Sequence, residues 1–228
     1  MIFEYIKGAV DEMLSSNISR MTITDNKYID ENADFDSIKF ESIKFDSGCG
    51  INDKMFVSST FVDCDFSNNE IRNCTFNDCD FVNCNLSLSK FSGTRFRDVS
   101  FTDCNLMGID WTAMNWPKRI MKKQYKFTIT FVRCIMNYSI FIGLEMYQAI
   151  FKDCSLKESC FEDADLEKAI FHNTDLASAT FNNTNLTKAD LSTARNYNIN
   201  VGANRLHKAK FSLPEAMSLL YSMDIEIV

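Results

Sequence analysis

The sequence predicts an all-β solenoid, an elongated fold in which the chain turns a corner every five residues and stacks its coils. Two columns of residues indicate this fold. Large apolar side chains recur at every fifth position from Phe61 to Leu191, and small residues stand two positions earlier. Gly and Pro are scarce, with 7 and 2 copies, which argues against a turn-rich sandwich or barrel. A chain of 228 residues is expected to form one domain with small appendages.

The column of large residues is nearly unbroken, since every fifth residue between Phe61 and Leu191 is apolar except Lys126. A period of five matches neither the 3.6 of a helix nor the two of a flat strand. Each five-residue side is therefore expected to send one large and one small residue inward and three polar residues outward. The small column includes Cys64, Cys74, Cys79, Cys84, Ser89, Thr94, Cys104, Cys134, Ala149 and Cys154.

Stretches such as FVDCDFSNNEIRNCTFNDCDF and FEDADLEKAIFHNTDL resemble the pentapeptide-repeat family, whose unit reads roughly A(D/N)LXX. The resemblance covers about residues 33–211. It implies a right-handed quadrilateral β-helix with four pentads per coil, so that residues twenty apart lie above one another. Residues 35–191 would then form about eight coils, and at about 4.8 Å per coil the rod would be roughly 40 Å long.

Two segments interrupt the repeat. The stretch DSGCGINDK, between Phe45 and Phe56, carries one residue too many and reads as an outward loop near 46–55. Residues 112–130, TAMNWPKRIMKKQYKFTIT, keep the five-residue phase but lose the small column, so they are expected to form one distorted coil. This coil contains basic residues and no acidic one, and a basic segment is expected to project from it near Trp116 to Tyr125.

The two ends are expected to close the solenoid, because open coils expose unpaired strand edges. Residues 1–32 are predicted to form an N-terminal cap, with 33–211 as the β-helix and 212–228 as a C-terminal helix and tail. Ser212 and Glu215 read as a capping box with Pro214 in the first turn. The helix is expected to run to about Met223 and either plug the open end or pair two subunits. Related proteins dimerise there, so the resemblance implies a homodimer. The apolar face of this helix is predicted to consist of Leu213, Ala216, Met217 and Leu220.

No catalytic, metal or cofactor site is expected. His172 and His207 fall in no Ser–His–Asp or Cys–His pattern, and the cysteine spacing fits no zinc motif. Most of the 9 cysteines read as small filler of the core, with Cys49 and Cys160 as the exposed candidates. The chain is therefore predicted to be a binding protein and not an enzyme.

The charge and the N-terminus bear on partners and location. A net charge of −7 and a pI near 4.9 disfavour nonspecific nucleic-acid binding and suit a basic partner. The segment MIFEYIKGAVDEML does not read as an export signal, and the sequence has no run of 18 apolar residues. Together with the odd number of cysteines, these features predict a cytoplasmic protein with reduced thiols.

Folding the sequence onto coils of twenty residues concentrates acid on two adjacent sides of the rod. Asp and Asn before the large residue belong to the family unit, so the repeat itself accounts for part of this acid. The alternative is a charge pattern resembling a DNA backbone, which a basic DNA-binding protein would bind. The acidic residues predicted to form the partner-binding surface are Asp63, Asp65, Asp103, Glu145, Asp163 and Asp165 on one side and Asp78, Asp80 and Asp98 on the other.

Within the family, the loop SGCGIND, the segment CNLMGIDWTAMNWP and the tail NYNINVGANRLHKAKFSLPEAMSLL are most similar to the quinolone-resistance (Qnr) group and the microcin-immunity proteins. That resemblance implies DNA gyrase or topoisomerase IV as the partner, protected from a toxin or a quinolone-type inhibitor. It also implies partner contacts through two loops. The loop residues concerned are Cys49, Gly50, Ile51, Asn52, Asp53, Trp116, Pro117, Lys118, Arg119, Lys122 and Lys123. A structural or adaptor repeat protein with another protein partner remains the alternative.

Overall fold

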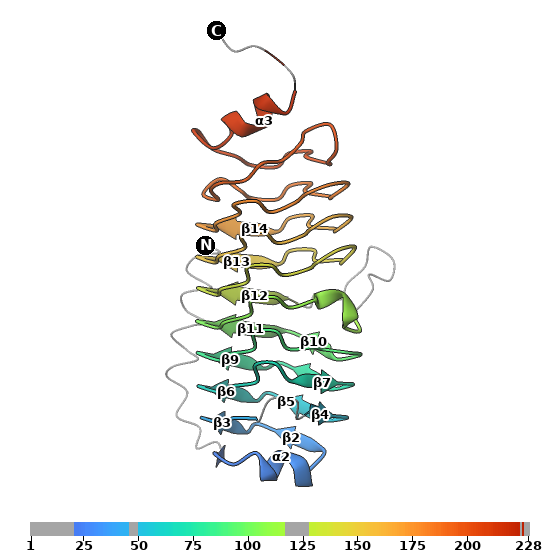
Figure 1. Ribbon diagram of the computed structural model, residues 1–228, viewed down its shortest axis with the longest axis vertical. Helices are drawn as coiled ribbons and strands as arrows, with labels where there is room; N and C mark the ends of the chain where they lie inside the picture. The colour runs from blue at the N-terminus through green and yellow to red at the C-terminus, as the bar shows by residue number, and fades with distance from the viewer. Residues whose placement is uncertain (1–20, 46–49, 117–127, 224, 226–228) are drawn as a thin grey trace.

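The computed structural model of the chain describes residues 21–45, 50–116, 128–223 and 225. The predicted all-β solenoid is confirmed: short strands and single bridges stack in parallel along a rod (Figure 1). The rod has about seven turns. Four five-residue sides make one coil, and we number these sides in chain order.

The first side is an eight-stranded parallel sheet in the order β1-β3-β6-β9-β11-β12-β13-β14. Its strands are β1 (Thr22–Ile23), β3 (Lys39–Glu41), β6 (Thr60–Val62), β9 (Asp80–Val82), β11 (Val99–Thr102), β12 (Ile129–Val132), β13 (Ile150–Lys152) and β14 (Ile170–His172). The second side has no named strand and continues through single bridges, as from Asp65 to Asn85 and from Asn85 to Asn105.

The third and fourth sides complete each coil. The third side pairs β4 (Gly50–Asn52) with β7 (Glu70–Arg72) and continues through Phe91, Trp111 and Phe141. The fourth side is a sheet in the order β10-β8-β5-β2. Its strands are β2 (Asp34–Asp36), β5 (Met55–Val57), β8 (Thr75–Asn77) and β10 (Arg95–Arg97).

The five-residue sequence period arises because each strand is at most four residues long and ends at a corner. The middle residue of a strand is buried and its neighbours face outward, as in β7, where only Ile71 is buried. Corner residues such as Asp63 and Asn83 adopt a positive φ of 55° and 53°. Asp and Asn tolerate this left-handed conformation better than most residues, which explains how the rod turns its corners with few glycines.

The core consists of ladders of stacked aromatic rings. On the first side, the ring centroids of Phe61 and Phe81 lie 4.7 Å apart and those of Phe81 and Phe101 lie 4.9 Å apart. The small column beside the rings supplies hydrogen bonds, because each thiol or hydroxyl donates to a carbonyl oxygen of the coil below. Ser89 Oγ donates to Phe66 O at 2.7 Å, and Cys84 Sγ to Phe61 O at 3.4 Å.

Residues 117–127 of the predicted distorted coil lie outside the described residues, and the residues on either side do not follow the predicted twenty-residue register. Phe101 pairs directly with Phe131, and Trp111 stacks on Phe141, so residues thirty apart are neighbours here. The chain inserts ten residues between Trp116 and Thr128. The prediction that residues twenty apart lie above one another holds on either side of the insertion but is wrong across it. The rod has about seven turns instead of about eight for the same reason.

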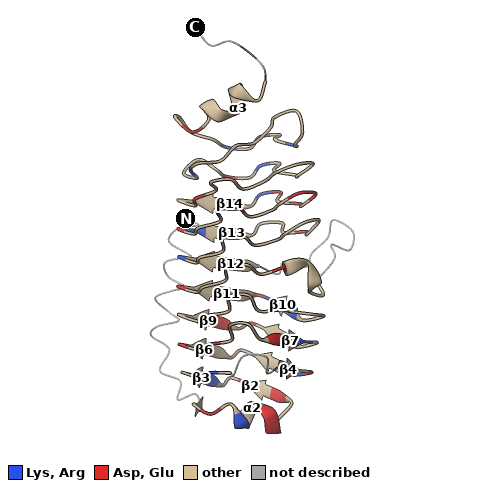
Figure 2. Cartoon of the chain, in the orientation of Figure 1, with Lys and Arg blue, Asp and Glu red and all other residues tan. Residues whose placement is uncertain are grey.

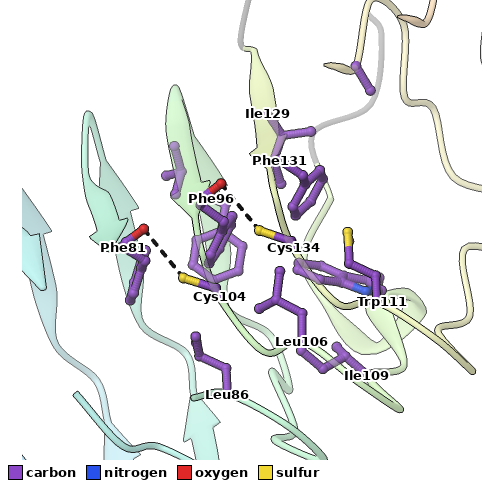
Figure 3. Close-up of a cluster of buried hydrophobic side chains, with 14 of the residues drawn as sticks. Phe81, Leu86, Phe96, Cys104, Leu106, Ile109, Trp111, Ile129, Phe131 and Cys134 are labelled. Carbon is purple, nitrogen blue, oxygen red and sulfur yellow. Dashed lines mark hydrogen bonds between the residues drawn. The ribbon is translucent and has the colours of Figure 1, made fainter. Parts of the chain in front are cut away.

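The hydrogen bonds of the buried cysteines follow the same thirty-residue step across the insertion. Cys104 Sγ donates to Phe81 O, and Cys134 Sγ donates to Phe101 O, both at 3.4 Å (Figure 3). Cys134 therefore follows Cys104 in one column. The predicted stacks of Cys64, Cys84 and Cys104 and of Cys134 and Cys154 are confirmed, and the insertion joins them into a single ladder. The seven cysteines expected in the core are all buried.

Residues 46–49 of the predicted first loop lie outside the described part of the chain, and the rest of it is largely regular structure. Gly50–Asn52 form strand β4, and Ile51 is buried against Ile71. The extra residue lies between Phe45, which stacks on Phe66, and Gly50, which pairs with Glu70. Below these coils, β1 pairs with β3, and the short helix α2 (Lys27–Glu31) buries Ile29.

The C-terminal helix is shorter than predicted. Helix α3 covers Met217–Tyr221 only, and residues 213–216 form turns. The predicted capping box is wrong, because Ser212 Oγ donates to the Ser192 carbonyl and no side chain caps the start of α3. Leu219 packs against the core, while Leu213 is 75% exposed. A 3-10 helix, η1 (Trp111–Ala113), lies just before the insertion, where Asp110 Oδ1 accepts from Thr112 N.

Candidate partner-binding surface

The insertion separates the acidic residues that the sequence predicted on one flank. Ten residues equal two sides of the rod, so every residue after the insertion moves to the opposite side. Asp65 stacks with Asn85 and Asn105 on the second side, and that column continues with Ile135 and Ser155. Glu145 and Asp165 form a different column on the fourth side. The predicted flank of stacked carboxylates therefore does not exist as one surface.

Six of the nine predicted acidic residues do come together below the insertion. Five lie on the first side and its two corners, and Asp65 lies on the adjoining second side, across the coils of β6, β9 and β11. We call this set the acidic face. Figure 2 shows red segments at α2, β2, β7 and β9 in the same half of the rod, with basic residues between them. The acidic face consists of Asp63, Asp65, Asp78, Asp80, Asp98 and Asp103.

Ladder hydrogen bonds hold these carboxylates in place. Asn83 Nδ2 donates to Asp63 Oδ1 at 2.6 Å, and Ser100 Oγ donates to Asp80 Oδ1 at 2.6 Å. Both bonds join successive coils, so the carboxylates also serve the repeat itself. Each carboxylate still has further acceptor capacity, because an ionised Asp offers about four lone-pair sites. The acidic face is thus a fixed array of carboxylates.

The acidic face ends where the insertion begins. Arg133 forms a bidentate pair with Asp103, with Nε–Oδ1 and NH2–Oδ2 distances of 2.6 and 2.7 Å. Hydrogen bonds from Arg133 lower the pKa of Asp103. The corner column of Asp78 and Asp98 continues above the insertion through Thr128 and Gln148 and then turns basic, because its last three members are lysines. Those lysines are Lys168, Lys188 and Lys208.

The other three predicted acidic residues form a separate group on the fourth side. Asn183 Nδ2 donates to Asp163 Oδ1 at 2.6 Å, and Asn185 Nδ2 donates to Asp165 Oδ1 at 2.8 Å. Glu145 bridges to Asp165 through the backbone. These residues use the same ladder bonds as the acidic face but point away from the second side, where the twenty-residue register placed them.

The described residues of the two predicted partner-binding loops belong to the regular part of the rod. Gly50, Ile51 and Asn52 belong to strand β4, and Asp53 is a corner residue whose Oδ1 accepts from Asn73 Nδ2 at 3.2 Å. Trp116 does not project, because it packs against the core and its Nε1 donates to Glu145 O at 2.8 Å. The remaining predicted loop residues lie outside the described part of the chain. These are Cys49, Pro117, Lys118, Arg119, Lys122 and Lys123.

The predicted apolar helix face is only partly formed. Met217 and Leu220 lie in α3 and are half-buried, Ala216 precedes the helix, and Leu213 stands exposed before it. Tyr221 is 71% exposed, so the C-terminal end carries uncovered apolar surface.

The described residues contain no group of three or more His, Cys, Asp or Glu side chains that could hold a metal ion. His172 Nδ1 shares a hydrogen bond with Thr193 Oγ1 at 3.0 Å, across successive coils. Burial raises the pKa of Cys74 to about 11 and that of Cys79 to about 12, so these thiols stay protonated and unreactive. Within the same ranges, no helix has the length and apolarity needed to cross a membrane.

Sequence reasoning missed one group of surface residues. Four large apolar side chains are exposed in the first coil after the insertion, where the repeat calls for polar residues. A signal was present, because these residues stand at outward positions between the buried ones. The four are Ile135, Tyr138, Ile140 and Ile142.

Comparison with known proteins agrees with this architecture. The family described as pentapeptide repeat region matches residues 54–128, and that described as pentapeptide repeats (8 copies) matches residues 159–195. The search of the curated proteins found no match.

Solved structures give the fold alone. HetL, a pentapeptide repeat protein involved in heterocyst differentiation regulation from the cyanobacterium Nostoc sp. strain PCC 7120, is similar with a TM-score of 0.60 at 14% identity, over 90% of this chain and 92% of HetL. Full-length QnrB1, a plasmid-mediated fluoroquinolone resistance protein, gives a TM-score of 0.42 at 20% identity, over 85% of this chain and 100% of QnrB1. From the five-residue period, the stacked coils and the two family matches, we conclude that residues 54–128 and 159–195 are pentapeptide repeats.

Proposed function

We propose that this chain is a binding protein that protects a type II topoisomerase, DNA gyrase or topoisomerase IV, from a toxin or a quinolone-type inhibitor. The observation that carries the proposal is the acidic face. Its carboxylates recur on successive coils, about 4.8 Å apart along the rod, which is on the order of the 3.4 Å between successive charges of one DNA strand. A basic surface that binds the DNA backbone is therefore complementary to the acidic face.

The register of the rod limits which acidic residues can belong to the proposed binding surface. The twenty-residue register made Glu145, Asp163 and Asp165 part of the same binding surface as Asp63. The observed register removes them, because they lie on the fourth side. Binding through the acidic face is confined to the half of the rod below the insertion, where acidic residues outnumber basic ones about two to one.

The test is gyrase supercoiling of relaxed plasmid DNA in the presence of a fluoroquinolone, with the chain titrated in. We expect the native chain to restore supercoiling. The variant Asp63→Asn, Asp78→Asn and Asp80→Asn should need about tenfold more protein. Three surface charges at roughly 0.5 kcal/mol each amount to about 1.5 kcal/mol, close to the 1.4 kcal/mol that corresponds to a tenfold change.

A charge-matched control comes from the other side of the rod. The variant Glu145→Gln, Asp163→Asn and Asp165→Asn removes the same number of charges and should protect as well as the native chain. Equal loss in both variants would show that net charge and not the acidic face is responsible. No protection by the native chain, and no co-purification with gyrase or topoisomerase IV, would favour the alternative of an adaptor with another protein partner.

We further propose that the chain forms a homodimer through its C-terminal end. Leu213 and Tyr221 are 75% and 71% exposed there, beside the last coil. Burying these side chains between two copies would remove apolar surface from water. Sedimentation equilibrium should give a dimer for the native chain and a monomer for the variant Leu213→Ser and Tyr221→Ser. A native monomer at micromolar concentration would overturn this part of the proposal.

A further inference from the structure

One corner of the rod carries apolar side chains where every neighbouring coil carries polar ones. Leu88, Ile135, Tyr138, Ile140 and Ile142 are between 37% and 55% exposed. We call these five residues the apolar patch. They lie on the second and third sides and the corner between them, away from the first side that bears most of the acidic face.

Backbone bonds place the patch on three consecutive coils. Leu88 N donates to Met107 O, and Gly108 N donates to Asn137 O, both at 2.9 Å. Leu88, Gly108 and Tyr138 therefore form one corner column, with φ values of 58°, 69° and 61°. A Cβ atom at Gly108 would lie 2.6 Å from Leu88 Cδ2, so the Leu88 side chain covers Gly108 and reaches toward Tyr138. The patch thus spans three consecutive coils, with Gly108 between Leu88 and Tyr138.

The fold does not require apolar residues at these positions. The same corner column holds Asn68 below the patch and Ser178 above it, and both suit a positive φ and contact with water. Leu and Tyr are unfavourable in the left-handed region and gain nothing from exposure. Ile135 and Ile140 likewise stand in columns whose other members include Asn105, Ser155 and Thr180. Contiguous exposed apolar side chains rimmed by polar residues mark interaction sites.

The charges around the patch indicate what it binds. Glu158 continues the corner column directly above Tyr138, and a hydrogen bond with Glu158 raises the pKa of the Tyr138 hydroxyl. Glu162 follows Ile142 on the third side, and Asp110 stands directly below Ile140.

The nearest bases on these sides have acidic neighbours of their own. Lys157 Nζ lies 3.4 Å from Asp175 Oδ2, and Lys90 pairs through its backbone with Glu70, whose pKa its charge helps to lower. The rim is therefore anionic. A second copy of this chain would place like charges against each other, which disfavours self-association through this patch.

We propose that the apolar patch binds an amphipathic helix of a partner protein whose apolar face is flanked by Lys and Arg. Three coils span about 10 Å along the rod, and two helical turns rise about 11 Å. Apolar residues at positions i, i+4 and i+7 of such a helix would contact the three levels of the patch in turn. Basic residues beside them would face Glu158, Glu162 and Asp110.

The proposal is tested with a synthetic probe on the full chain. The probe is a fluorescein-labelled 15-residue Leu/Lys peptide with its leucines on one helical face. Two control peptides are a scrambled version without that face and a Leu/Glu version. We expect the Leu/Lys peptide to bind in fluorescence anisotropy at least about tenfold more tightly than either control, because only this peptide complements both the apolar patch and its rim.

Polar variants of the patch use residues that the same columns already contain. The patch variant combines three substitutions, Leu88→Asn, Tyr138→Asn and Ile135→Ser. The two Asn residues follow Asn68 of the same corner column, and the Ser follows Ser155 of the Ile135 column, so all three suit the local backbone. Binding of the Leu/Lys peptide should weaken at least about tenfold. The control variant Met55→Thr removes an exposed apolar residue of the fourth side, where Thr75 holds the next position of the column, and should bind as the native chain does.

Unchanged binding by the patch variant, with its circular dichroism spectrum preserved, would overturn the proposal. So would tight binding of the Leu/Glu peptide, since it would contradict the anionic rim. A dimer that dissociates in the patch variant would assign the patch to a second copy instead. Because the assay contains no topoisomerase, its outcome is independent of the proposed protective function.

Discussion

Replacing Phe131 by Ala tests whether the rod is held together across the insertion by its aromatic ladder. Phe131 is fully buried and belongs to β12, the first strand after the insertion. Its ring centroid lies 5.3 Å from that of Phe101 below, 5.2 Å from that of Phe151 above and 5.5 Å from that of Trp111, on the third side of the coil below. The substitution therefore removes three aromatic pairs at once.

The expected loss of stability follows from these contacts. Truncating a buried Phe to Ala costs about 3–5 kcal/mol, because the transfer free energy is lost and a cavity remains. Each aromatic pair adds about 0.5–1.5 kcal/mol beyond burial. Phe181 is the matched control, since it occupies an equivalent inward position, is 6% exposed and stacks on no described ring but that of Phe161. Phe131→Ala should cost about 1–3 kcal/mol more than Phe181→Ala, through its two additional pairs.

The assay is urea denaturation followed by far-ultraviolet circular dichroism, with the free energy of unfolding taken from the midpoint and slope. Because each coil contacts only its neighbours, loss of Phe131 should also weaken the coupling between the two halves of the rod. A lower slope or a second transition in Phe131→Ala would report that uncoupling. An equal or smaller cost than that of Phe181→Ala would refute the reasoning, since it would mean that the ladder does not continue from Phe101 to Phe131.

Three further predictions concern the glycines, the thiols and one buried carboxylate. Gly108→Ala should destabilise the protein by about 1 kcal/mol more than Gly143→Ala in the same assay. Both glycines have a φ near +68°, but only Gly108 has a neighbour within reach of a new Cβ. Equal costs would contradict the contact with Leu88. The buried thiols should react with Ellman's reagent only after unfolding, since burial raises the pKa of Cys104 and Cys154, and rapid reaction of more than two thiols in the native chain would be inconsistent with the ladder. Burial of Asp175 opposes its ionisation, but the hydrogen bond from Asn196 Nδ2 and the nearby Lys157 leave its folded-state pKa lowered. Its contribution to stability is therefore present above the unfolded-state pKa of about 3.9 and lost as the pH falls through the lower folded-state pKa. Asp175→Asn should thus lower the urea midpoint at pH 7 more than at pH 3, and equal effects at both pH values would argue against the shift.

Much of the fold could be predicted from the sequence because the side chains of a repeat solenoid report directly on its geometry. Phe61, Phe81 and Phe101 lie in one internal column, as the five-residue period predicts. The small residues beside them are buried and donate to carbonyl oxygens of the neighbouring coil. Each prediction depends only on adjacent coils, so local sequence suffices to make it.

The ends of the rod were less predictable. Ser212 and Glu215 predicted a helix start from the local preference of a short segment for a capping box. In the structure, Ser212 Oγ instead donates to the Ser192 carbonyl, so it does not cap a helix. Likewise, the glycines of SGCGIND indicated a loop, but Ile51 finds a buried place beside Ile71 and draws Gly50–Asn52 into a strand. In both cases a tertiary contact outweighed a local preference.

Within the repeat, the sequence by itself determined whether a residue faces inward or outward, because that depends only on the five-residue phase. Only the tertiary structure decided which distant residues share a face. A segment of ten extra residues leaves the phase unchanged, yet it turns the rest of the rod by two of its four sides. Strand pairing of Phe101 with Phe131, thirty residues on, fixes that turn and places Asp63 and Asp163 on different flanks.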